Sequence, residues 1–149
     1  MKVFAAKKED MSAWLNLARE VEHLFGPMAD DESFQKALLA AVEEGNALCI
    51  KDGAGKKRLC GGVVINPETR EVVWLAVSEK HRRRGAGCLL LGNAIERLGT
   101  AGSISVVTFA DSIGEGLAAR NLYIKHGFIE QEPVGENPAG FPIVLMVRE

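Results

Sequence analysis

Six consecutive residues near the middle of the chain, Arg82-Arg83-Arg84-Gly85-Ala86-Gly87, have the types and spacing that bind phosphate groups. Arginine offers a planar fork of N–H donors that matches phosphate oxygens, and glycine lets the backbone approach a ligand closely. Apolar runs at residues 72–77 and 88–98 flank this stretch, which predicts a strand, a loop and a helix. The first N–H groups of a helix lack intrahelical partners and lie at the positive end of its dipole. The stretch is therefore interpreted as a site for a phosphorylated ligand.

The same basic cluster has two simpler interpretations, a solvated turn or a patch that binds nucleic acid. The charge balance argues against the second, because 18 Lys and Arg residues and 20 Asp and Glu residues give a formal net charge of −2 at pH 7. A general nucleic-acid binder needs a basic stripe. The adjoining glycines and the predicted helix start favour phosphate binding over a solvated turn, and no nucleic-acid partner is expected.

Length and composition predict one globular domain over residues 1–149, with 47% hydrophobic and 26% charged residues. The cysteines, Cys49, Cys60 and Cys88, are odd in number and show no close pair, so neither a metal site nor a disulfide framework is expected. They are interpreted as buried free thiols of a reducing compartment. The first residues lack the apolar segment of a signal peptide, and no run approaches membrane-spanning length. The protein is therefore expected to be cytoplasmic, without a membrane partner.

The periodicity of the first half predicts the elements that lead to the phosphate loop: a short strand, two helices and an antiparallel meander of three strands. The helices begin near the acidic residues Glu9 and Asp10 and near 30–32, and they end at the turn signals Gly26 and Gly45. The predicted strands of this half cover residues 2–6, 47–51, 59–65 and 71–78, and a hairpin connection covers 52–58.

The second half predicts a helix, a buried strand, a second helix and two closing strands. The first helix follows Arg84 and ends around residues 99–102, and the buried strand covers 104–109. The second helix covers about 117–126, and the closing strands cover 128–132 and 141–147. A strand, a helix and a strand across residues 72–109 imply a right-handed parallel crossover. The fold class is therefore α/β in the α+β sense, a mixed, mostly antiparallel sheet of about seven strands flanked by about four helices.

Two segments resemble motifs of the GCN5-related N-acetyltransferase (GNAT) family. Residues 82–87 match the pattern Arg/Gln-x-x-Gly-x-Gly/Ala after an apolar strand that ends Leu75-Ala76-Val77. Residues 119–128, Ala-Arg-Asn-Leu-Tyr-Ile-Lys-His-Gly-Phe, are similar to the family's Ala-x-x-Leu-Tyr-x-Lys-x-Gly-Phe helix. The two matches cover about residues 72–128, and the expected order of elements fits the family fold over nearly the whole chain. Either motif alone is weak evidence, whereas both at this spacing are a specific signal.

The resemblance implies that acetyl-coenzyme A is bound and lies across the strand that ends at Val77. In the family this strand carries a bulge and splays from the next one, here residues 104–109, which opens a cleft for pantetheine and acceptor. Backbone groups of Leu75 and Val77 would pair with the pantetheine amides. The loop residues that would contact the pyrophosphate are Arg82, Arg83, Arg84, Gly85, Ala86 and Gly87. Successive side chains cannot all point the same way, so Arg82 or Arg84 is expected to reach the phosphates.

Acetyl transfer requires a deprotonated amine, a stabilised oxyanion and a proton for the departing thiolate. By resemblance, Tyr123 meets the sulfur as general acid, and the N–H of Val77 donates to the oxyanion. A phenol titrates near 10, so Tyr123 is neutral at pH 7 and has a proton to give. Its alternative interpretation is an amphipathic residue that closes a helix against the sheet. No general base stands out, because four polar residues near the cleft fit exposed positions better: Glu22, His23, Glu71 and Glu79.

One departure from the family pattern concerns the helix that carries the tyrosine. Relatives commonly have Asn seven residues before it, in contact with the cofactor, and this chain has Gly116 there. Asn121 lies on the same helix and is the candidate replacement. It is therefore included among the expected cofactor contacts.

The resemblance thus implies an acetyl-CoA-dependent N-acetyltransferase that moves the acetyl group directly to a primary amine. The acceptor would be a small molecule, such as a small amine, an aminoglycoside-like molecule or an amino acid, or a protein. The loops that would select it, about residues 25–31 and 132–141, carry no readable specificity. The alternative function is a non-catalytic domain that senses CoA or acetyl-CoA, which the missing Asn leaves open. Edge strands of this fold also invite a homodimer.

Overall fold

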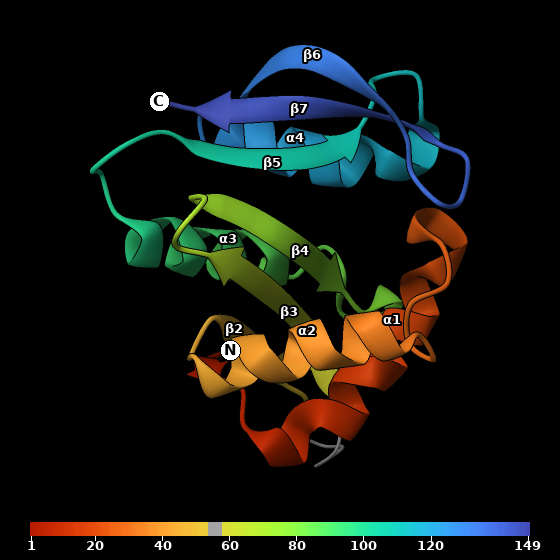
Figure 1. Cartoon of the computed structure of the whole chain (residues 1–149), viewed down its shortest axis with the longest axis vertical. Helices are drawn as coiled ribbons and strands as arrows, with labels where there is room; N and C mark the ends of the chain where they lie inside the picture. The colour runs from red at the N-terminus through yellow and green to blue at the C-terminus, as the bar shows by residue number, and fades with distance from the viewer. Residues whose placement is uncertain (54–57) are drawn as a thin grey trace.

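The computed structural model describes residues 1–53 and 58–149, and it confirms the predicted fold class (Figure 1). Within these residues, seven strands form one sheet in the order β1-β2-β3-β4-β5-β7-β6, and only the neighbours β4 and β5 are parallel. The strands are β1 (Val3–Ala5), β2 (Ala47–Lys51), β3 (Leu59–Asn66), β4 (Glu71–Val77), β5 (Ile104–Phe109), β6 (Ile129–Glu136) and β7 (Pro142–Arg148). The helices are α1 (Met11–Phe25), α2 (Glu32–Glu43), α3 (Ala86–Leu98) and α4 (Leu117–Lys125).

Helices cover the two faces of the sheet unequally. Helices α3 and α4 lie behind the sheet in Figure 1, and α1 and α2 lie in front of its β2–β4 part. Apolar residues of α3 at helical spacing, among them Leu90, Leu91 and Ala94, are buried against residues of the central strands. On the other face, Trp14 and Leu17 of α1 are buried together with residues of α2 and β2. The front of β5 and β7 has no helix in this view.

The two middle strands of the sheet part soon after they meet. Strand β4 pairs with β3 along its length, with a register shift that leaves Val73 as an extra residue. Its pairing with β5 is confined to Glu71 and Val72, opposite Ser105 and Val106. This geometry confirms the expected bulge and the expected splaying of the parallel pair, and we call the stretch where β4 and β5 are no longer paired the opening.

The last two strands depart from the sequence prediction. Strand β6 runs through Pro133 to Glu136, whereas the prediction ended it at residue 132. Proline has no N–H to donate and is excluded from central strands. It is accommodated here because β6 is the edge strand and its register shifts after Pro133. Strand β7 begins and ends one residue later than predicted, at Pro142 and Arg148.

Three further expectations have structural outcomes. The hairpin connection predicted at 52–58 contains residues 54–57, which lie outside the described residues. No helix in the described ranges is long and apolar enough to cross a membrane. The three cysteines are free thiols; Cys49 and Cys60 are buried as expected, whereas Cys88 in the first turn of α3 is only half-buried.

Candidate active site

The predicted phosphate loop joins β4 to α3 through one short 3-10 turn, Glu79–His81. The three arginines and Gly85 are exposed, and Ala86 is buried. Arg83 and Gly85 have φ angles of +65° and +83°, the left-handed region that glycine adopts without steric cost. The backbone thus turns between β4 and α3 with its arginine side chains facing solvent.

The backbone N–H groups of this loop are free to bind an anion. Among the described residues, no hydrogen bond uses the N–H groups of residues 83–88, and the next one, that of Leu89, donates to the Gly85 carbonyl oxygen at 3.0 Å. The free groups include the first turn of α3, where the helix dipole is positive. The Arg82 side chain donates through Nε to the Val77 carbonyl oxygen at 3.3 Å, which holds it at the end of β4.

The open edge of β4 also presents backbone groups. The Ser78 N–H donates to the Cys60 carbonyl oxygen at 2.7 Å, which makes these two residues a hydrogen-bonded pair between β3 and β4. Hydrogen-bonded and non-bonded pairs alternate along an antiparallel ladder, so Leu75 and Val77 turn their N–H and C=O groups away from β3. Strand β5 has already parted there, and these groups face the opening.

The phosphate loop and α4 meet at a glycine. A Cβ atom placed on Gly87 would lie 3.0 Å from Leu122 Cδ2 and 3.7 Å from Val77 Cγ2. The absent side chain therefore lets α3 start close to both β4 and α4. Tyr123 follows Leu122, so the helix that carries the predicted general acid packs against the start of α3.

Tyr123 is held in an apolar environment. Its side chain is 4% exposed, and its ring meets the Phe128 ring edge to face with centroids 5.6 Å apart. Burial raises the pKa of its hydroxyl above the ordinary value of 10, because the phenolate would lose its hydration. Within the described ranges the hydroxyl has no hydrogen-bond partner, yet it is not among the fully enclosed polar atoms. The phenol therefore keeps its proton at neutral pH, and no neighbouring group of the protein engages it.

Gly116 and Asn121 have separate positions on α4. A Cβ on Gly116 would lie 2.4 Å from the Cβ of Phe109, so the Phe109 side chain occupies the space that an Asn would need. Asn121 is exposed, and two positions along a helix place it about 200° around the axis from Tyr123. The structure therefore does not bring Asn121 and Tyr123 together.

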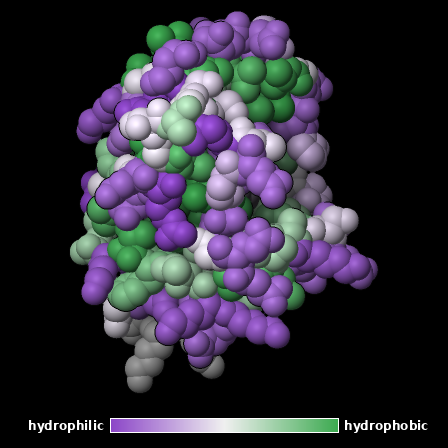
Figure 2. Space-filling view, turned by 60° about the vertical axis from the view of Figure 1, so that its left-hand side comes forward, coloured by the Kyte–Doolittle hydropathy of each residue, from purple (hydrophilic) through white to green (hydrophobic). Residues whose placement is uncertain are grey.

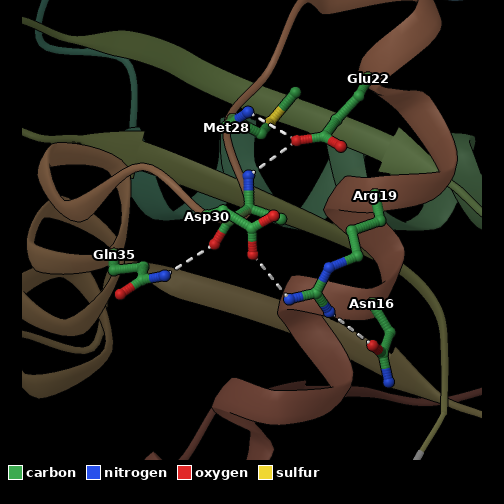
Figure 3. A network of polar contacts seen from close by, with 7 residues as sticks. Asn16, Arg19, Glu22, Met28, Asp30 and Gln35 are labelled. Atoms are coloured by element: carbon green, nitrogen blue, oxygen red, sulfur yellow. Dashed lines mark hydrogen bonds and ion pairs between the residues drawn. The ribbon is translucent and has the colours of Figure 1, made fainter.

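The connection between α1 and α2, residues 26–31, is fixed by a polar network (Figure 3). The Glu22 carboxylate accepts hydrogen bonds from the N–H groups of Met28 at 2.6 Å and Ala29 at 2.9 Å. These bonds, that of Met28 foremost, lower the pKa of the Glu22 carboxyl below its ordinary value of 4.5. Arg19 pairs with Asp30 at 3.2 Å. Glu22 thus holds this loop in place and is not a free base.

The loop between β6 and β7 contacts the end of α1 and the connection that follows it. The Asn137 side chain donates through Nδ2 to the Leu24 carbonyl oxygen at 2.9 Å. The Phe109 ring packs against Phe25 at 5.5 Å and Phe141 at 5.8 Å between centroids. Both loops are therefore joined at the end of β5.

The remaining candidate bases are dispersed. His23 and Glu79 are exposed, and Glu71 is half-buried at the closed end of the opening. The structure also shows a polar pair that no sequence pattern indicated: the buried Ser78 hydroxyl donates to a Glu20 carboxylate oxygen at 3.1 Å, across 58 sequence positions. This pair ties α1 to the end of β4.

Comparison with known proteins identifies the family of this chain. Residues 37–130 match the model of the acetyltransferase (GNAT) domain. No curated protein is similar enough to be matched by the search. Solved structures of similar fold include a ribosomal-protein-alanine N-acetyltransferase from Brucella melitensis, with 18% identity, coverage of 99% of both chains and a TM-score of 0.77. A spermidine N-acetyltransferase from Vibrio cholerae shares 18% identity over 99% of this chain and 94% of the other, with a TM-score of 0.69. An N-acetyltransferase from Thermoplasma acidophilum in complex with coenzyme A shares 15% identity over 99% and 98%, with a TM-score of 0.69.

Proposed function

The chain belongs to the GNAT acetyltransferase family, and on this premise we propose that residues 1–149 form an acetyl-CoA-dependent N-acetyltransferase domain. It transfers the acetyl group directly to a primary amine of a small molecule or a protein. The observation that carries the proposal is the unpaired edge of β4, which leads into a loop of free N–H groups, and α4, the helix of the buried Tyr123, packs against the start of α3 through Leu122. The unpaired edge and the loop supply groups that can orient amides and bind a diphosphate, and we assign the proton donor to Tyr123.

The residues around the opening fit acetyl-CoA as a substrate. The free N–H groups of residues 83–88, together with the side chains of Arg82 or Arg84, bind the pyrophosphate. The outward N–H and C=O of Leu75 and the C=O of Val77 pair with the pantetheine amides, as a neighbouring strand would, which leaves the Val77 N–H free. A contact of Asn121 with the cofactor stays a prediction, and it would involve a part of the cofactor that lies outside the opening.

The chemistry follows from the same groups. The uncharged amine nitrogen attacks the thioester carbon, and a C–N bond forms as the C–S bond breaks. The N–H of Val77 stabilises the negative charge that develops on the carbonyl oxygen. Tyr123 gives its proton to the departing sulfur, and the proton released by the amine returns to the phenolate through solvent. Because a thiol titrates near 8.5 and the pKa of Tyr123 is raised above 10, the phenol still holds its proton where the thiol is ionised.

A two-stage experiment tests this function. Calorimetric titration with acetyl-CoA and with CoA measures binding, and a thiol-release assay against a panel of primary amines measures turnover. We expect binding of both forms and release of thiol only when an amine is present. Absence of binding contradicts the assignment of the loop, and tight binding without turnover on any amine identifies a non-catalytic sensor instead.

A further inference from the structure

The front of the sheet beside the opening is an uncovered apolar surface. Side chains alternate along β5 and β7, and Val106, Val144 and Met146 belong to the core behind the sheet. The residues between them face the front, and the register places them side by side. We call these residues the apolar face: Val107, Ile129, Ile143, Leu145 and Val147.

This surface is exposed in the folded chain. Val107 is 46% exposed and Ile129 is 64% exposed, and the three residues of β7 are half-buried. In Figure 1 no helix lies in front of β5 and β7. Figure 2 shows apolar side chains exposed toward the top of the molecule, where Figure 1 places β5, β7 and β6. Contiguous exposed apolar side chains on a soluble domain mark a binding surface.

The apolar face is continuous with the opening. Val107 directly follows Val106, the last residue of β5 that pairs with β4. Phe109 lies on the same side of β5 two residues later, and its contacts with Phe25 and Phe141 close the far end with aromatic rings. An amine that reaches the opening therefore has hydrocarbon side chains next to it along β5.

The charged groups of α1 near the opening already have partners inside the protein. Arg19 pairs with Asp30, the Glu22 carboxylate accepts two backbone N–H groups, and Glu20 accepts the Ser78 hydroxyl. At the outer margin of the apolar face, the edge strand contributes one carboxylate, Glu132, opposite Leu145. Glu71 of β4, beside Ser105, is a second carboxylate on the same side of the sheet, so charged groups flank the apolar face while its own five positions are uncharged.

We infer that the acceptor amine carries a bulky apolar group, aryl or branched alkyl, which lies on the apolar face. The inference rests on the proposed transferase function and specifies its substrate class. The step from β5 across β7 to β6 spans about 10 Å, because neighbouring strands lie about 4.8 Å apart, and this width suits a ring or branched chain. Contact with Val107 and Leu145 removes apolar surface from water, whereas a second ammonium group there would lose hydration.

The test compares three amines in the thiol-release assay with wild-type protein: phenethylamine, ethanolamine and spermidine. We expect kcat/KM for phenethylamine to exceed the other two by at least about tenfold, the discrimination that one or two apolar groups provide. The ranking is measured on the unaltered protein, so it does not depend on the folding of a variant.

Variants then locate the effect on the apolar face. Val107→Asp should bring the phenethylamine-to-ethanolamine ratio close to one, and Val107→Thr, which keeps the β-branched shape, should reduce it in part. Phe4→Asp is the matched control, because Phe4 is also apolar and 41% exposed but lies on β1 at the opposite edge of the sheet. It should leave the ratio as in wild type.

Three outcomes overturn the inference. A preference for spermidine or ethanolamine by an active enzyme contradicts the substrate class and leaves the transferase function standing. An unchanged ratio in Val107→Asp, with a light-scattering mass that falls from dimer to monomer, assigns the apolar face to a second copy of the chain. Binding of acetyl-CoA without acetylation of any amine refutes the proposed function and, with it, this inference.

Discussion

Strand β4 has two edges, and the protein uses them differently. Toward β3 the strand is paired along its length, and the pairing is interrupted only by the extra residue Val73. Toward β5 only Glu71 and Val72 are paired, and Leu75 and Val77 face an opening. A backbone group deprived of both protein and water partners costs about 1–3 kcal/mol, so an unpaired edge inside a sheet needs a partner from outside the chain. The β3 edge thus contributes to stability, and the β5 edge is where we propose the site.

The β3 edge of β4 is closely packed as well as paired along its length. A Cβ placed on Gly62 would lie 2.6 Å from Cη2 of Trp14, so the indole of α1 rests directly on the backbone of β3. The Trp14 ring also contacts the Trp74 ring of β4, with centroids 5.6 Å apart. Substitutions at the two edges should therefore separate stability from activity.

The largest effect is expected at the proposed site, from Tyr123→Phe. Loss of the proton donor should lower kcat/KM by about 100-fold or more, because positioned acids contribute on that order. The melting temperature should stay close to that of wild type, since the phenyl ring keeps its contact with Phe128. Thiol release and thermal unfolding measure the two quantities. A kcat/KM within twofold of wild type would remove Tyr123 from the mechanism.

The next effect is expected at the paired edge, from Gly62→Ala. The added methyl group meets the Trp14 ring at 2.6 Å, and overpacking of this kind costs about 1–3 kcal/mol of unfolding free energy, or roughly 3–10 °C in Tm. The acetyl-CoA dissociation constant, measured by calorimetry, should not change. Gly92→Ala on α3 is the control, since a Cβ there meets no atom within 4 Å. If Gly62→Ala weakens cofactor binding without lowering Tm, the division between the two edges is wrong.

A smaller effect is expected from Arg82→Ala in the phosphate loop. Loss of one charge-assisted hydrogen bond should weaken acetyl-CoA binding about tenfold, with Tm unchanged because the side chain is exposed. Arg82→Lys keeps the charge but loses the Nε bond to Val77, so it should give an intermediate affinity. Lys36→Ala is the control, because it also removes one exposed positive charge but lies on α2; its affinity for acetyl-CoA should equal that of wild type. Equal affinity of all four proteins would exclude Arg82 from phosphate binding.

The smallest effect concerns the loop beside the opening and depends on pH. The folded-state pKa of Glu22 is lowered, so its carboxylate stabilises the fold above the unfolded pKa near 4.5, and this contribution is lost as pH falls through the folded value. Glu22→Gln should lower Tm slightly at pH 7, and the difference from wild type should shrink below pH 4.5. Glu43→Gln, an exposed residue of α2, should show no such pH dependence. A difference that is constant from pH 7 to pH 3 would contradict the role of the carboxylate charge.

The sequence alone determined the order of elements and the identity of the two motifs. Strands such as β2 and β5 and the ends of α1 and α2 follow from local periodicity and from glycine and proline positions, which act through short-range sterics. The motif of residues 82–87 was recognisable for the same reason, because its arginines, glycines and helix start are consecutive; phosphate binding by it stays a prediction. The extension of β6 through Pro133 was not, since a proline is compatible with a strand only at an edge, and edge position is a property of the whole sheet.

Only the tertiary structure decided which groups meet at the opening. The register shift at Val73 turns the N–H groups of Leu75 and Val77 outward, and the contact of Phe109 with Gly116 excludes a side chain where the family pattern has Asn. Helical phase separates Asn121 from Tyr123, and folding exposes the apolar face that sequence periodicity would assign to a core. These features join residues far apart in the chain, so they depend on packing between elements and not on local pattern.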